Sequence, residues 1–455
     1  MELLKRKEKS SLTTKVLQFG EGNFLRGFVD WMIDRLNKEY DWNGGVAVVQ
    51  PLPGGITNLI SDQDGLYHLY LRGLLNGKRE EETRVVECIT DAFNPYEETE
   101  RFFDYAKKPE LRFIVSNTTE AGIEYKSGGK DGDFVNSTFP GRLAMFMKKR
   151  YDAGLPGFII LPCELIDKNG DRLKECVLKY AGDWNYGSGF AEWVNSENYF
   201  TNTLVDRIVT GYPRDRAEEM CREYGVLDNV IDTAEIFHLW VIEGDKKLAG
   251  EMPFHKIGLN VIWTDDVTPY KKRKVRILNG AHTMMVPAAY LAGIRTVREA
   301  MDNEIVFEFM RRGIFDEVIP TIDMDKEELI SFANDVTERF KNPFIEHYLI
   351  SIALNSVSKF KVRVLPSLWG YIEKTGREPK CLVFSLAALI AFYKTDDAND
   401  SADVTEFMKN ADIGEILAKT EYWDRDLSML KESVEKYFGQ INAAGALKAM
   451  EELLA

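Results

Sequence analysis

The chain has 455 residues, beyond the roughly 250 to 300 at which one hydrophobic core stops growing, and 45% are hydrophobic, so two globular domains of unequal size are expected. Its 73 acidic against 58 basic residues give a formal net charge of -15, which disfavours nucleic acid or an anionic membrane as a partner but allows a small anionic substrate in a local basic pocket. Residues 1 to 15 are polar and no run of about 18 apolar residues follows, so we expect a soluble protein of the cytoplasm.

The first part of the chain predicts alternating strands and helices. An apolar run at 15–19 meets the glycine turn at 20–22 and then a helix with apolar residues at helical spacing from Phe24 onward. Strands alternating with helices predict a largely parallel sheet covered on both faces. The other predicted strands are 46–49, 67–71, 84–88, 111–115 and 157–161, and the helices between them are about 97–107 and 140–153.

The composition and periodicity of the sequence change near Asp266, where a long helical pattern begins. The remainder is rich in Leu, Ala, Glu and Lys at helical spacing, with turns expected at Asn342-Pro343, at Pro366 and at 394–403. We therefore expect an α/β protein with an N-terminal Rossmann-like dinucleotide-binding domain, 1–265, and a mainly α-helical C-terminal domain, 266–455.

A dinucleotide site is predicted at the turn between the first strand and the first helix. The first glycine permits the tight turn, and the second allows the backbone to approach a pyrophosphate at the helix N-terminus. The third glycine of the fingerprint is replaced by Leu25, and Arg26 beside it is a candidate to neutralise phosphate. An ordinary glycine turn entering a helix is the alternative. The predicted contacts are Phe19, Gly20, Glu21, Gly22, Asn23, Phe24 and Arg26.

The end of the second strand lacks the acid that usually binds the NAD ribose, because Val49 is followed by Gln50 and Pro51. Asp62 and Asp64 lie farther on and are equally well explained as loop carboxylates. No Arg or Lys occurs between positions 46 and 70 to hold a 2'-phosphate, so NAD is favoured over NADP as the cofactor.

Polar residues also follow the strand that ends near Val115, at the edge where ligands bind in open α/β sheets. We assign them to the nicotinamide ribose, with a helix cap as the alternative. They are Asn117, Thr118, Thr119 and Glu120.

The segment from Lys274 to His282 carries an ammonium, an amide and an imidazole. At about 100° per residue, Asn279 lies about 140° and His282 about 80° around the helix from Lys274, so the three can converge on one cleft wall. A buried lysine of lowered pKa can exchange a proton with a substrate hydroxyl, while the other two hold the oxygen that gains charge. An amphipathic helix with three solvated polar residues is the alternative.

Two further charged segments are candidates for substrate binding. Asp206 lies in Val205-Asp206-Arg207-Ile208, a charged segment in apolar surroundings. Lys359-Phe-Lys361-Val-Arg363 places cations at alternate positions, where a bidentate arginine could hold a carboxylate. A solvated basic face explains the second segment equally well.

Metal chemistry is not expected. Five histidines never occur in H-x-x-x-H spacing and five cysteines never in C-x-x-C spacing, so neither a metal site nor a disulfide framework is indicated. A G-x-S-x-G elbow and a P-loop lysine pattern are also missing, which excludes the commonest hydrolase and phosphoryl-transfer motifs.

These segments, in this order, resemble the mannitol dehydrogenase family of metal-independent long-chain dehydrogenases, from about Lys15 to at least Pro366. The family signature is a lysine with an asparagine at plus five and a histidine at plus eight, as found at Lys274, Asn279 and His282. Further matches are V-D-R-I at 205–208 and E-x-F-x-x-W-V-I-E at 235–243.

One departure from the family pattern resembles its hexuronate branch. Members that oxidise polyols carry Cys-Asp-Asn, with an asparagine that helps to hold the reacting oxygen, whereas this chain has Cys163, Glu164 and Leu165. Other segments that resemble this branch are 18–26, 117–123, 163–170 and 206–215.

The resemblance implies NADH-dependent reduction of the 2-keto group of D-tagaturonate to D-altronate, a step of hexuronate catabolism. Lys274 would be the general acid, and the general base in reverse, while Asn279 and His282 stabilise the reacting oxygen. Arg363 with Lys359 would hold the substrate carboxylate. Fructuronate reduction to mannonate, oxidation of a polyol such as mannitol, and a non-catalytic nucleotide-binding protein stay open as alternatives, and the sequence does not indicate an oligomeric state.

Overall fold

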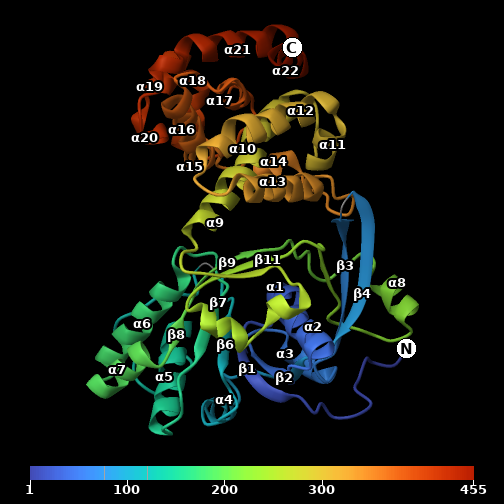
Figure 1. Ribbon diagram of the computed structural model, residues 1–455, viewed down its shortest axis with the longest axis vertical. Coiled ribbons are helices and arrows are strands. Elements are labelled where there is room, and N and C mark those ends of the chain that lie inside the picture. The colour runs from blue at the N-terminus through green and yellow to red at the C-terminus, as the bar shows by residue number, and fades with distance from the viewer. Residues whose placement is uncertain (76, 120) are drawn as a thin grey trace. The chain divides into compact units, whose positions relative to one another are not determined.

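The computed structural model describes residues 1–75, 77–119 and 121–455 and divides into two compact units. The first contains Met1–Arg72 and Glu80–Val267, and the second contains Thr268–Ala455 together with the short segment Gly73–Arg79 (Figure 1). The chain thus passes into the second unit after Val267, and the segment Gly73–Arg79, far earlier in the sequence, also belongs to that unit.

The first unit is built on a six-stranded sheet with the order β5-β2-β1-β6-β7-β8. All its neighbouring strands are parallel, which confirms the predicted α/β class. The strands are β1 Thr13–Phe19, β2 Gly44–Val49, β5 Ile89–Phe93, β6 Phe113–Ser116, β7 Ile159–Pro162 and β8 Tyr199–Phe200.

Alternate residues of the central strands pack into two hydrophobic cores. Val16 and Val48 belong to one core, whereas Leu17 and Val49 belong to the other. Because neighbouring strand residues point to opposite faces, burial of both faces requires the continuous apolar runs from which these strands were predicted. Helix α2, Trp31–Tyr40, contributes to the first core, and α5 Phe139–Asp152 and α6 Asn169–Asp183 contribute to the second.

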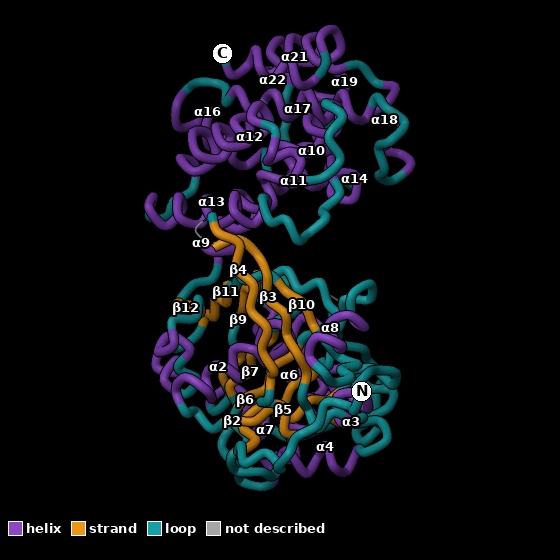
Figure 2. Tube along the Cα trace, turned by 90° about the vertical axis from the view of Figure 1, so that its right-hand side faces the viewer, coloured by secondary structure: helices purple, strands orange, loops and turns teal. Residues whose placement is uncertain are grey.

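Two predicted strands lie outside the parallel sheet. β3, Tyr67–Leu75, and β4, Lys78–Val86, are neighbours in a separate sheet of order β10-β3-β4, where β10 is Asp232–Ala234. Figure 2 shows β3 and β4 as long adjacent strands. The strand predicted at 84–88 was therefore wrong in its bounds and in its sheet. The observed strand β4 ends at Val86 and lies outside the parallel sheet, whose edge strand is β5.

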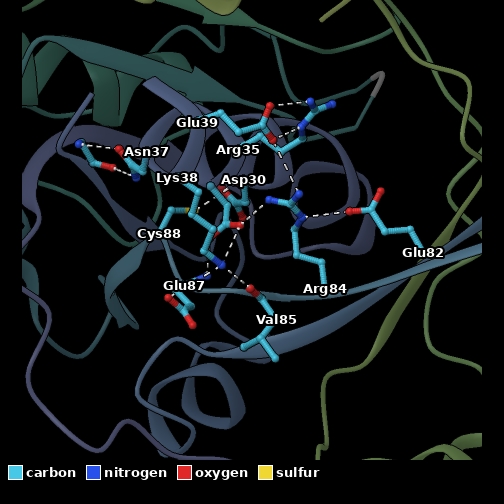
Figure 3. A network of polar contacts seen from close by, with 12 residues as sticks. Asp30, Arg35, Asn37, Lys38, Glu39, Glu82, Arg84, Val85, Glu87 and Cys88 are labelled. Atoms are coloured by element: carbon cyan, nitrogen blue, oxygen red, sulfur yellow. Dashed lines mark hydrogen bonds and ion pairs between the residues drawn. The ribbon is translucent and has the colours of Figure 1, made fainter. Parts of the chain in front are cut away.

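Charged side chains attach β4 to helix α2 (Figure 3). The guanidinium of Arg84 lies 3.3 Å from Asp34 and 3.6 Å from Glu39, and Glu39 also pairs with Arg35 at 2.7 Å. Lys38 donates to the carbonyl of Val85 at 2.9 Å. Exposed pairs contribute little singly, but Asp34 is buried, so the network helps to fix the strand against the helix.

A third sheet, of order β12-β11-β9, carries the V-D-R-I segment at its edge. β9 pairs antiparallel with β11, and β11 pairs parallel with β12. The strands are β9 Asn202–Asp206, β11 Leu239–Glu243 and β12 Val261–Thr264.

The second unit is helical, as predicted, around helix α17, Lys380–Tyr393, in which every residue after Lys380 is buried. Pro366, expected in a turn, lies instead in the first turn of α16, where its missing N–H costs no helical hydrogen bond. The helices used below are α9 Thr268–Arg273, η4 Lys274–Asn279, α10 Gly280–Leu291, α12 Glu304–Arg312, η5 Gly313–Val318, α13 Lys326–Phe340, α15 Ser356–Arg363 and α16 Leu365–Thr375.

Candidate active site

The glycine turn after β1 has the backbone geometry of a phosphate site. Gly20 has φ of +128°, and a Cβ on it would lie 3.0 Å from the carbonyl oxygen of Asn117 and 3.1 Å from Leu25 Cδ1, so any other residue there would be strained and crowded. Gly22 caps the helical run 23–40 without a side-chain hydrogen bond, and a Cβ placed on it would meet nothing within 4 Å. The space that a side chain of Gly22 would fill, at the N-terminus of this helix, is therefore open, which fits the pyrophosphate of a dinucleotide.

Arg26 lies inside the protein, only 1% exposed. Its guanidinium donates to the carbonyl oxygens of Glu21 and Val230 and to Asn23 Oδ1. In the structure, therefore, the predicted phosphate ligand Arg26 is buried and holds the turn through its hydrogen bonds to Glu21 and Asn23. Of the other four predicted residues of the turn, Phe19 is buried, Asn23 is exposed, and Glu21 and Phe24 are half-buried.

Two residues that the sequence analysis did not single out also hold the turn. Gln18 Nε2 donates to the carbonyl oxygen of Gly20 at 3.0 Å and to Asp30 Oδ2 at 3.2 Å. Asp30 is fully buried, and burial raises its pKa to about 7. A glutamine in the otherwise apolar strand at 16–19 is the sequence signal that could have pointed to this role.

The loop after β6 is braced by a buried glutamate. Glu164 accepts hydrogen bonds from Ser116 Oγ at 3.0 Å, from the N–H of Thr118 at 3.0 Å and from Thr118 Oγ1 at 2.9 Å. Burial raises the pKa of Glu164. Thr118 is therefore buried and hydrogen-bonded to Glu164, whereas Asn117 is half-buried. Thr119 is exposed, and its backbone has a positive φ of 78°. Glu120, also predicted to bind the ribose, lies outside the described residues.

The V-D-R-I segment packs against the same helical run. Arg207 is buried and donates to the carbonyl oxygens of Gly27 at 2.9 Å and Glu235 at 2.8 Å. Its guanidinium also lies 4.1 Å from the ring centroid of Trp31. Asp206, predicted to contact substrate, is buried at the end of β9.

In the second unit, the predicted catalytic lysine and asparagine lie on a π-helical turn, η4. The N–H of Gly280 donates to the carbonyl oxygen of Val275, five residues back. This turn is wider than an α-helical one, so residues five apart come closer to one face than the 140° expected from α-helical geometry. Lys274 and Asn279 are both half-buried, and His282 follows in the first turn of α10.

His282 is enclosed by two rings that the sequence analysis missed. Its imidazole stacks on Phe340, with centroids 4.1 Å apart and planes at 19°, and meets His347 edge to face at 5.1 Å and 78°. Burial lowers the pKa of His282 well below its ordinary value, and His347, Arg339 and Arg363 lower it further. The imidazole is therefore neutral at neutral pH. Its Nε2 is buried and accepts or donates no hydrogen bond within the described residues.

Arg363 lies beside this signature segment. Its Nη1 donates to Thr283 Oγ1 at 3.3 Å, and a Cβ on Gly280 would lie 3.3 Å from the Arg363 carbonyl oxygen, so the end of α15 packs closely on the start of α10. Burial lowers the pKa of Arg363. Lys359, one turn earlier, donates to the carbonyl oxygen of Ile352 at 3.0 Å. The structure thus brings the predicted carboxylate ligand Arg363 next to His282, with Lys359 on the same helix.

Among the described residues, no group of three or more His, Cys, Asp or Glu side chains is arranged to hold a metal ion. No helix in that part of the chain has the length and apolar character needed to cross a membrane.

Comparison with known proteins gives matches over nearly the whole chain. Residues 14–256 match the family model "Mannitol dehydrogenase Rossmann domain", and residues 266–443 match "Mannitol dehydrogenase C-terminal domain". Altronate oxidoreductases of Escherichia coli K12 and Shigella flexneri are each 43% identical over 453 residues, covering 94% of this chain and 94% of their own.

Two solved structures share the fold. A substrate-free D-sorbitol dehydrogenase superposes with a TM-score of 0.84 at 23% identity, covering 96% of this chain and 95% of that one. Pseudomonas fluorescens mannitol 2-dehydrogenase, in complex with NAD and D-mannitol, superposes with a TM-score of 0.68 at 24% identity, covering 100% and 96%. At these identities the likeness concerns the fold alone.

Proposed function

The chain belongs to the mannitol dehydrogenase family, and from this premise we propose that it interconverts D-tagaturonate and D-altronate with NAD(H) as the hydride carrier. Membership makes the chain an oxidoreductase that acts on CH–OH groups of a polyol or sugar acid. The choice of substrate rests on one observation, the 43% identity to altronate oxidoreductases over 94% of both chains.

The first unit would bind the cofactor at the glycine turn. The N–H groups that begin the helical run at Asn23 would receive the pyrophosphate, since the space beside Gly22 at the start of this run is open. Asn117 and Thr119 would approach the nicotinamide ribose from the loop that Glu164 braces. When bound, NADH supplies the hydride.

The second unit would supply the proton and the donors to the reacting oxygen. As the carbonyl oxygen of tagaturonate gains negative charge, Lys274 would protonate it, and it would take the proton back in the reverse direction. Asn279 and the neutral His282 would donate hydrogen bonds to that oxygen. The neutral state of His282 leaves Lys274 as the proton donor of the three.

The substrate carboxylate would be held by cations of α15. Arg363 can form two parallel hydrogen bonds to a carboxylate, and Lys359 adds positive charge one turn away. Asp206, at the end of β9, is retained as a candidate for a sugar hydroxyl.

Initial rates with tagaturonate, fructuronate and fructose under NADH test this proposal. We expect tagaturonate to give the highest kcat/KM. A preference for fructuronate would move the chain to the sister reductase activity, and a preference for fructose would defeat the sugar-acid assignment altogether.

A further inference from the structure

The carboxylate of Glu21 reaches from the glycine turn into the loop that follows β2. It accepts a hydrogen bond from the N–H of Ile56, and a Cβ placed on Gly55 would collide with its Oε1. The side chain is half-buried. An acid is therefore present at the carboxyl end of β2, although it comes from the turn after β1.

The rest of this loop offers no cation of its own. Residues 50–57 include neither Lys nor Arg. Gln50 is buried and its Nε2 donates to the carbonyl oxygens of Leu52 at 2.9 Å and Pro53 at 2.8 Å, which shapes the loop from within. Arg142 approaches the loop, but its guanidinium donates to the carbonyl oxygens of Pro51, Phe134 and Ser137.

The two acids that the sequence offered for this position lie on or beyond helix α3, Thr57–Asp62. Asp62 is exposed at the end of that helix. Asp64 accepts a hydrogen bond from the backbone N–H of Arg6 at 3.2 Å. Within the described part of the chain, neither carboxylate has a hydrogen bond to residues 50–57.

We propose that Glu21 replaces the missing acid of β2 and selects NAD(H) over NADP(H). In dinucleotide folds the adenosine ribose lies at the end of β2, beside the first glycine turn. A carboxylate there accepts a hydrogen bond from the ribose 2'-hydroxyl and repels a 2'-phosphate. The inference rests on the proposed function, because it requires a nicotinamide dinucleotide on this turn.

Binding constants of NADH and NADPH, measured by calorimetry without substrate, test the role of Glu21. Glu21→Gln keeps an oxygen that can accept from Ile56, so the turn should hold, and Asp62→Asn removes the same charge from the exposed end of α3. We expect wild type and Asp62→Asn to prefer NADH, and Glu21→Gln to reduce that preference by about tenfold or more, since hydrogen bonds to charged groups contribute about 1.5 to 3 kcal/mol. Glu21→Lys should reverse the preference.

Three results would overturn the inference. The first is a preference for NADH that is unchanged in both Glu21 variants. The second is an equal loss of affinity for NADH and NADPH in Glu21→Gln, which would mean that Glu21 has only a structural role in the turn. A wild-type preference for NADPH would overturn the inference yet leave the dehydrogenase function standing. Absence of binding of either cofactor to the wild type would refute the proposed function itself.

Discussion

The imidazole of His282 lies flat on the ring of Phe340, 4.1 Å between centroids, although the two residues come from different helices. Phe340 is the last residue of α13, and His282 stands in the first turn of α10. The stack fixes the plane of the imidazole and removes water from one of its faces, which contributes to keeping it neutral.

Replacement of Phe340 by leucine should weaken catalysis through His282. Loss of an aromatic stack contributes about 0.5 to 1.5 kcal/mol, so we expect kcat/KM to fall roughly three- to tenfold. The acid limb of the pH profile should also move to higher pH, because a more hydrated imidazole regains its proton more readily. Phe309→Leu, which removes a buried ring of α12, is the control. If both variants lose activity equally with unchanged pH profiles, the stack has no role beyond packing.

Lys274→Ala should abolish most turnover without loss of cofactor binding. General acid catalysis contributes about 10² to 10⁴ in rate, so kcat for tagaturonate reduction should fall by that factor. The dissociation constant of NADH should change by less than about twofold, because the glycine turn is intact. Lys272→Ala, which removes an exposed lysine of the preceding helix α9, should match the wild type. Unchanged turnover in Lys274→Ala would remove this lysine from the mechanism.

Arg363→Ala should weaken the binding of substrates that carry a carboxylate and leave the binding of uncharged sugars nearly unchanged. Loss of a charge-assisted hydrogen bond should raise KM for tagaturonate roughly 10- to 100-fold, while KM for fructose, which has no carboxylate, changes little. Lys361→Ala serves as the control on the same helix, because its Nζ pairs with Asp424 at 2.6 Å. An equal rise of KM for both substrates in Arg363→Ala would mean that the guanidinium does not bind the carboxylate.

Glu317 should make the stability of the second unit depend on pH. Its carboxylate accepts the N–H groups of Cys381 and Leu382 at 2.9 Å each, at the start of α17, and burial raises its pKa to about 7. A pKa raised above the unfolded value favours folding at low pH, and that contribution is lost as pH rises from about 4.5 to about 7. The full shift corresponds to about 3 kcal/mol.

Denaturation of wild type and Glu317→Gln between pH 5 and pH 8 measures this effect. The wild type should lose stability relative to the variant as pH rises through this range, because glutamine does not ionise. Parallel pH profiles of the two proteins would show that Glu317 does not titrate there.

The sequence predicted those parts of the fold that a continuous apolar run specifies. The strand at 46–49 was found because both of its faces are buried, and the glycine turn was found because any other residue at Gly20 would be strained and crowded. The strand at 78–86 could not be placed by the same rule, since it reads K-R-E-E-E-T-R and is mostly exposed. Its conformation depends on pairing with β3, a contact that no local pattern reveals.

The sequence predicted which residues form the candidate site, but it did not predict which side chains surround them. The spacing of the signature indicated Lys274 and His282, whereas the rings around His282 come from segments near Phe340 that carry no motif. Arg26 was expected to face a ligand, yet its guanidinium donates to carbonyl oxygens, one of which belongs to Val230, far from Arg26 in the sequence. Partners of this kind are set by tertiary packing, so they cannot be deduced from spacing alone.

A π turn is in effect an α-helix that has taken in one extra residue. At Lys274–Asn279 the extra residue lets two side chains five positions apart lie nearly as close around the axis as residues four apart in an α-helix, which differ by about 40°. The five-residue interval in the family signature therefore depends on the π turn. If this segment took the ordinary α-helical pitch with all its residues kept, the lysine and the amide would be about 140° apart, and the proton donor would be separated from the group that holds the oxygen.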